Sequence, residues 1–197
     1  MKFKITVRGL VFSALFAALL VVFGFVTINL GFTPVPITLA TFAIMLAGAF
    51  LGPWYGFFSV LLVILLSVLG LPLIGGSGGI AIIVGPSAGF VWSWPFAALF
   101  IGFFIDKIKG HGLRTYILTF IIMEVFGSLI MYLPGVPWLQ HVLQISFIKA
   151  MIMGCYPYLP GDAIKALVAT LIVVPIKSVY PTSRLVGKGQ RQVVELE

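Results

Sequence analysis

The sequence predicts an all-α integral membrane protein with six transmembrane helices, arranged as one membrane domain over residues 1–197. Three observations support this prediction. Hydrophobic residues make up 61% of the chain, the mean hydropathy is +1.20, and charged residues contribute only 9%. A soluble domain would be about 25% charged. Apolar runs recur along the whole length, which is typical of a polytopic helical membrane protein.

The first half of the chain contains one long apolar run and two short ones. As a helix that rises about 1.5 Å per residue, residues 9–28 are long enough to cross a bilayer. Because they lack a clear cleavage site, we interpret them as a retained helix and not as a signal peptide. A turn at Gly52 separates residues 39–51 and 55–70, which as helices would be only about 20 and 24 Å long. Both are shorter than the roughly 30 Å hydrocarbon core, so the loops that follow them should dip into the membrane and line a pocket open to the outer face.

Three further apolar runs complete the predicted bundle: residues 87–105, 115–133 and 162–179. The stretch from Pro134 to Trp138 contains two prolines and should end the second of these runs, because proline interrupts a helix. Residues 139–155 mix apolar and polar side chains and predict a short helix at the membrane interface or partly within it. The basic tail, residues 180–197, is expected to be flexible.

Asp162 and Lys165 stand out in a chain that has only 5 acids and 12 bases. Pro160 suits the entrance of a helix, so Asp162 falls in the first turn, where the helix dipole favours an anion. Lys165 follows three positions later and shares the same face. The pair belongs either to a ligand site or to a first-turn cap with a snorkelling salt bridge. Glu124 lies in mid-span and should face the bundle interior, as a structural acid or in a proton relay.

The distribution of bases predicts the orientation of the chain in the membrane. Six spans place ten of the twelve bases on one side, all but Lys149 and Lys165. The positive-inside rule makes that side cytoplasmic, together with both termini, in the cell membrane. The same placement favours membrane topology over nucleic-acid binding as the reason for the net charge of +7. The features that are hardest to explain by packing then gather outside, which indicates a single ligand site.

A glycine-rich loop follows the third run, with Gly75, Gly76 and Gly78 around Ser77. Glycine exposes the backbone and lets a ligand approach closely, and the alternative interpretation of the stretch is a flexible connector. No Gly-Lys-Ser/Thr sequence follows, so the loop is not an ATP site. Cys155 is the only cysteine and there are two histidines, so we expect no disulfide, no metal site and no cofactor.

The first run carries small residues at helical spacing, among them Ala14 and Ala18 on one face. Small residues four apart let another helix approach closely. The face could pack within the chain's own bundle or receive a partner protein.

Several motifs together resemble the BioY family, the biotin-binding S components of energy-coupling-factor (ECF) vitamin transporters. The resemblance covers about residues 34–166 in the family's order and approximate spacing, and departs from its pattern at Ala40, Trp54 and Phe90. The matching segments are Pro34–Leu39, Leu46–Pro53, Gly70–Pro72 with the glycine cluster, Gly85–Ser87, Gly135–Leu139 and Leu159–Ala166.

The resemblance implies a six-helix S-component-type bundle that captures biotin from outside. Import by this family needs a transmembrane coupling protein of the EcfT type and two cytoplasmic ATPases. The family docks the coupling protein on an Ala-xxx-Ala face of its first helix, which Ala14 and Ala18 match.

For biotin, the sequence offers candidate contacts of three kinds. Asp162 could accept from a ureido N–H, and Lys165 could donate to the ureido oxygen or neutralise the carboxylate. Hydroxyls, backbone groups and ring-shielding aromatics would come from Thr38, Ser77, Gly75, Gly76, Gly78, Trp138, Phe32 and Tyr158.

Two other functions stay open at this point. The same fold could carry a different vitamin, which a binding assay would distinguish. An integral-membrane enzyme would use Asp162 and Glu124 as acid and base, but they are expected at different depths and without an activated nucleophile. A bare channel is disfavoured, because no ring of charges or continuous polar stripe is present.

Overall fold

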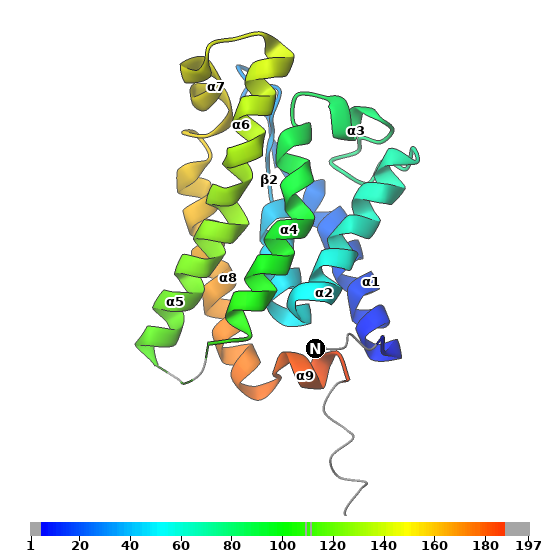
Figure 1. The fold of residues 1–197 in the computed structure, drawn as a ribbon, viewed down its shortest axis with the longest axis vertical. Helices are drawn as coiled ribbons and strands as arrows, with labels where there is room; N and C mark the ends of the chain where they lie inside the picture. The colour runs from blue at the N-terminus through cyan, green and yellow to red at the C-terminus, as the bar shows by residue number, and fades with distance from the viewer. Residues whose placement is uncertain (1–4, 109, 111, 188–197) are drawn as a thin grey trace, which may run out of the picture.

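The computed structural model describes residues 5–108, 110 and 112–187, and nearly all of this chain is helical (Figure 1). Within these described residues, five helical segments are long and apolar enough to cross a membrane. They are α1 (Val7–Gly24), α2 (Ala40–Val68), α4 (Ala88–Ile105), the continuous helix Leu113–Leu143 and α8 (Leu159–Val179). The prediction of an all-helical protein with membrane-spanning segments is therefore confirmed.

The short elements lie in the connections. They are β1 (Thr27–Ile28), β2 (Ile37–Thr38), α3 (Ala81–Val84), α7 (Phe147–Gly154) and α9 (Thr182–Leu185). The first helix was predicted to reach Ile28, but it ends at Gly24. The β-branched residues that follow adopt an extended conformation instead, and β1 pairs antiparallel with β2, Thr27 opposite Thr38.

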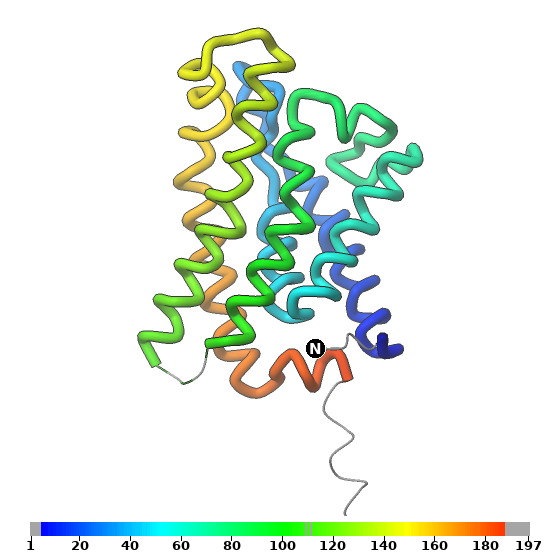
Figure 2. The backbone as a smooth tube through the Cα atoms, viewed as in Figure 1, coloured from blue at the N-terminus to red at the C-terminus, as the bar shows by residue number. Residues whose placement is uncertain are grey.

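The predicted turn at Gly52 is present and folds α2 back on itself (Figures 1 and 2). Gly52 has φ 75°, a conformation that L side chains rarely adopt, and divides α2 into two arms. The arms approach so closely that a Cβ at Gly56 would lie 3.0 Å from the Cα of Gly48. Pro53 has no N–H to donate to the carbonyl of Ala49, and Lys177 Nζ donates to that oxygen instead, at 2.9 Å.

The predicted end of the fifth apolar run at Pro134 is wrong. The helix continues from α5 (Leu113–Glu124) through a π-helical turn, η1 (Val125–Leu129), into α6 (Ile130–Leu143), with Pro134 and Pro137 inside α6. Tertiary packing outweighs the local cost of these prolines. A Cβ at Gly135 would lie only 2.3 Å from the Phe90 ring, and Leu139 is fully buried.

The predicted interfacial segment after this helix is only partly helical. Residues 139–143 still belong to α6, and α7 begins at Phe147 after a short turn. Gln144, at φ 52°, closes α6 in the left-handed conformation that often ends helices. The segment thus forms a helical hairpin beside the start of α8 (Figure 1).

The two faces of α1 have different surroundings. Gly9, Ser13 and Ala17 are buried, and Ser59 of α2 donates to the carbonyl of Ser13 at 2.8 Å. Ala14 and Ala18, in contrast, are exposed. The packing interface of this helix therefore uses the neighbouring face, and the Ala14/Ala18 face has no described part of the chain over it.

The tail is ordered over its first residues, where flexibility was expected. After α9, Val186 is fully buried, and its carbonyl accepts from the Thr6 hydroxyl near the start of α1. This contact ties the start of α1 to the segment after α9 at the base-rich end of the bundle. The remaining tail lies outside the described residues, as do these charged or titratable residues from the sequence argument: Lys2, Lys4, Lys109, His111, Lys188 and Arg191.

Candidate functional site

A cavity of about 110 Å³ lies among α2, α4, the long helix and the first turn of α8. Aromatic and aliphatic side chains form one wall, and a group of hydroxyl, carboxylate and ammonium groups forms the other. The lining residues are Val35, Pro36, Thr38, Thr41, Ile74, Ser87, Phe90, Val91, Trp94, Ser128, Met131, Tyr132, Gly154, Tyr158, Asp162 and Lys165. An apolar pocket with a few convergent polar groups is typical of a small-molecule site.

Asp162 and Lys165 form the charged centre of this wall. α8 begins at Leu159 with Pro160 in its first turn, as the sequence predicts, and Asp162 is one turn into the helix. Lys165 Nζ lies 2.5 Å from Asp162 Oδ1. The two residues are only 9% and 7% exposed, so the pair is buried and does not snorkel to water. The cap-and-snorkel interpretation is therefore wrong.

The Lys165 ammonium uses its full hydrogen-bonding capacity within the protein. Besides Asp162, it donates to Thr41 Oγ1 at 2.7 Å and to the carbonyl oxygen of Thr38 at 3.2 Å. An ammonium has three N–H donors, and these three partners account for them. The segment from β2 into α2 is thereby fastened to α8 at the site.

The Asp162 carboxylate is held from the other side by the long helix. Its Oδ2 accepts from the Ser128 hydroxyl at 2.9 Å and from the Tyr132 hydroxyl. Ser128 lies in the π-helical turn, and such turns frequently mark functional sites. The sequence analysis missed both residues. The available signal was a pair of hydroxyl side chains four positions apart in an apolar run, which places them on one helix face.

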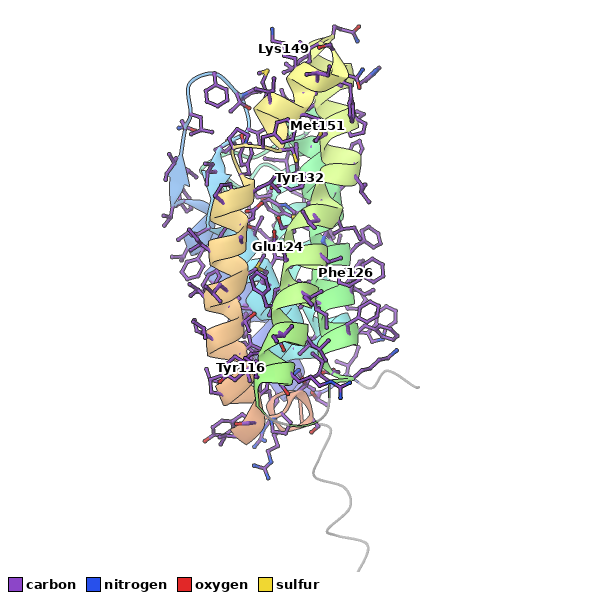
Figure 3. The ribbon with its side chains drawn as sticks, turned by 90° about the vertical axis from the view of Figure 1, so that its left-hand side faces the viewer. Tyr116, Glu124, Phe126, Tyr132, Lys149 and Met151 are labelled. Carbon is purple, nitrogen blue, oxygen red and sulfur yellow. The ribbon has the colours of Figure 1, made fainter. Side chains whose placement is uncertain are left out.

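Glu124 lies deeper along the same helix, between α8 and the rest of the bundle (Figure 3). The residue is half-buried, and its Oε2 is buried without a hydrogen-bond partner among the described residues. It faces the interior, as the sequence predicts, but it is not one of the residues lining the cavity.

The apolar wall is built mainly by α4 and the long helix. Phe90 and Trp94 lie one turn apart on α4, and Met131 faces them from α6. Tyr158 closes the cavity toward the loop before β2, because its hydroxyl donates to the carbonyl of Val35. Burial raises the pKa of Tyr158, so its hydroxyl stays a donor.

The structure brings four of the sequence-predicted binding residues together: Thr38, Tyr158, Asp162 and Lys165. The glycine-rich loop contributes Ile74 to the cavity, while Gly75, Gly76 and Ser77 are exposed beside it and Gly78 packs on the backbone of Leu71. Trp138 donates to the carbonyl of Gly85 at 2.9 Å, and Phe32 is exposed. Ligand contacts by these loop residues, Trp138 and Phe32 stay a prediction.

A larger hollow of about 500 Å³ lies at the opposite, base-rich end, between α5 and α8. Its charged groups have a structural role. Asp106 Oδ1 accepts from Lys177 at 2.7 Å and from Thr182 at 2.7 Å, and Lys177 also holds the carbonyl of Ala49 at the α2 turn. This ion pair therefore fastens α2, α4, α8 and α9 together, and the smaller cavity is the better candidate for ligand binding.

The fold and the cavity define a class: a multi-pass helical membrane protein with a cavity that contains a buried ion pair. The BioY family model matches residues 1–182, and the chain belongs to the BioY family. It is 40% identical to the biotin transporter BioY of Rhizobium etli, over 88% of this chain and 95% of that protein. It is 38% identical to the biotin transporter BioY of Lactococcus lactis subsp. cremoris, over 85% and 89%.

A solved structure shows the same fold. The crystal structure of the S-component for biotin from an ECF-type ABC transporter superimposes with a TM-score of 0.80 at 37% identity, covering 87% of this chain and 92% of that one. The resemblance read from the sequence motifs is thereby confirmed.

Proposed function

We propose that this protein is the substrate-binding subunit for biotin uptake in an ATP-driven ECF-type importer, and that biotin binds in the cavity at Asp162 and Lys165. The observation that carries the proposal is this buried ion pair, which faces an apolar cavity in a member of a family of biotin transporters. Burying two charges is costly unless they are paired and hydrogen-bonded, and here every partner converges on the cavity.

The hydrogen bonds at the site favour the ureido ring as the end of biotin that meets the ion pair. Asp162 Oδ1 accepts one bond in the protein and has a lone pair left for a ureido N–H. The Thr38 and Thr41 hydroxyls already accept from Ala40 N and Lys165 Nζ, so their protons are free for a ureido oxygen. A ligand carboxylate would instead have to displace a bond to Lys165. The apolar wall at Phe90 and Trp94 suits the thioether ring.

Import by this chain then needs partners. A transmembrane coupling protein of the EcfT type would dock on α1, and two cytoplasmic ATPases would supply energy. The exposed Ala14/Ala18 face supports this assignment, because the adjacent Gly9/Ser13/Ala17 face already packs inside the bundle. Small side chains allow close helix–helix approach within a bilayer.

The proposed topology counts the two arms of α2 as separate crossings, which gives six spans in one membrane domain. An even number puts both termini on the same side, and the concentration of bases makes that side cytoplasmic. The ligand cavity and the hollow beside the Asp106–Lys177 pair are lined by opposite ends of α8, so the proposed topology makes the cavity face outward. Ligand capture from outside follows from this orientation.

Equilibrium binding of biotin to the detergent-purified protein is the decisive test. We expect saturable binding of one biotin per chain, with much weaker binding of other vitamins such as riboflavin and thiamine. Biotin methyl ester should bind nearly as well as biotin, because the ureido ring and not the carboxylate meets the ion pair. Recovery of chemically unchanged biotin would distinguish binding from enzymatic turnover. Tighter binding of another vitamin would contradict the proposal.

A further inference from the structure

A separate groove of about 330 Å³ lies at the base-rich end, where the C-terminal end of α4 meets the start of α5. Its lining combines two cations with apolar side chains: Phe104, Lys107, Ile108, Arg114 and Leu118. The ligand site proposed above uses none of these residues, and neither does the charge cluster at Lys177.

The two cations of this groove differ from others at the same end. Lys177 is paired with Asp106, and Arg184 donates to the carbonyl of Val179. Over the described part of the chain, Lys107 and Arg114 have no acidic side chain within 4 Å. The Lys107 ammonium lies 3.7 Å from the centre of the Phe103 ring, an attraction that holds it near the ring face. The groove thus presents positive charge that the described protein does not neutralise.

The apolar part of the groove, with the neighbouring Phe103, is exposed on the flank of the bundle. Phe103 and Phe104 are 45% and 36% exposed, and Leu118 is 37% exposed one turn beyond Arg114. Phe104 stacks on Phe126 with ring centres 4.8 Å apart, so this wall is firm. The groove has positive charge at one end and apolar surface along the direction of the helices. This arrangement matches an amphiphile with an anionic head.

We propose that this groove binds an anionic glycerophospholipid, with its phosphate between Lys107 and Arg114 and an acyl chain along Phe104 and Leu118. Charge complementarity selects the anionic headgroup, because basic pockets between membrane helices attract such lipids. Position selects a lipid over an acidic protein segment, because the groove opens beside exposed apolar side chains where the last turn of α4 meets the first turns of the long helix, two helices long and apolar enough to span a membrane.

Native mass spectrometry of the full-length protein with added lipid tests the proposal. Phosphatidylglycerol and phosphatidylcholine with identical acyl chains would be compared on the wild type and on the double variant Lys107→Gln/Arg114→Gln. The matched control is Arg8→Gln/Arg184→Gln, which removes two charges from the same end but outside the groove. All four positions are exposed, and such substitutions change stability little.

We expect the wild type and the control to retain phosphatidylglycerol over phosphatidylcholine. The groove variant should lose affinity for phosphatidylglycerol by roughly 30-fold, since each base near a membrane surface contributes about one kcal/mol and 1.4 kcal/mol is a decade. Three results would overturn the proposal: equal losses in both variants, equal retention of the two lipids, or displacement of the lipid by inorganic phosphate alone.

Discussion

The Asp162–Lys165 pair has a proposed role in binding and a role in folding, which substitutions can separate. The two residues are neutralised one at a time and then together. Both side chains are about 10% exposed or less. Removing one partner of a buried pair leaves the other charge unpaired and costs about 3–5 kcal/mol of stability. Asp162→Asn and Lys165→Met should therefore each lower the melting temperature. Replacing both residues removes the unpaired charge, so the double variant should be more stable than either single variant.

Biotin affinity should follow a different pattern across the same three variants. A charge-assisted hydrogen bond in a buried site is worth about 1.5–3 kcal/mol, which corresponds to a loss of roughly 10- to 150-fold. The double variant recovers stability but regains neither the Asp162 acceptor nor the Thr41 hydroxyl orientation that Lys165 imposes. It should therefore stay at least as impaired in binding as the single variants.

The assay is biotin titration and thermal unfolding on the same detergent-purified samples. Wild-type affinity in the double variant would refute the site. Affinity losses that simply track the melting temperature across all three variants would also refute it, because the pair would then act only through the fold. In Asp162→Asn, the Ser128 and Tyr132 hydroxyls lose the charged carboxylate that accepts their hydrogen bonds, so that variant should be the weaker binder of the two singles.

Three further predictions follow from the packing and the topology. Ala14→Trp adds bulk to an exposed helix face and should block assembly with the coupling protein in a pull-down, while biotin binding by the isolated subunit survives; loss of both would assign this face to bundle packing. Gly135→Ala forces a Cβ to within 2.3 Å of an aromatic ring and should cost about 1–3 kcal/mol of stability, whereas Gly161→Ala, with open space around it, should be neutral; equal melting temperatures would contradict this. With Cys155 replaced by alanine, cysteines at exposed Ser77 and Ser183 should label from opposite sides of the membrane, and labelling from one side would overturn the proposed orientation.

The sequence predicted most of the fold because apolar runs and strong breakers dominate it. A glycine followed by a proline indicates a reversal of chain direction, and the structure has such a reversal at Gly52 and Pro53. The prolines of α6 misled the analysis, because a local rule cannot register that Gly135 packs on Phe90 and Leu139 is buried. The same limit explains why the first helix was wrongly predicted to reach Ile28. Residues 27–28 pair as a strand with a segment about ten residues further along the chain, and a local pattern does not show this pairing.

Of the candidate site, the sequence predicted mainly the two charged residues. Asp162 and Lys165 are conspicuous in an apolar chain and share a helix face, so their pairing follows from spacing alone. Their other partners come from α2 and from the long helix, and no local pattern connects these segments. The π-helical turn adds a second obstacle, because it shifts the register of the helix between Glu124 and Ser128 relative to regular α-helical spacing.

Irregular backbone occurs beside both ion pairs of the described chain. At the base-rich end, the turn at Gly52 and Pro53 leaves the Ala49 carbonyl without a helical donor, and Lys177 bonds to that carbonyl and to Asp106. At the ligand cavity, the π-helical turn carries Ser128 to Asp162, and the strand before α2 offers a carbonyl to Lys165. A regular helix satisfies its own polar groups and leaves none for a neighbour. A buried ion pair inside a membrane bundle therefore depends on such interruptions, and the one that faces a cavity is where a ligand can join the network.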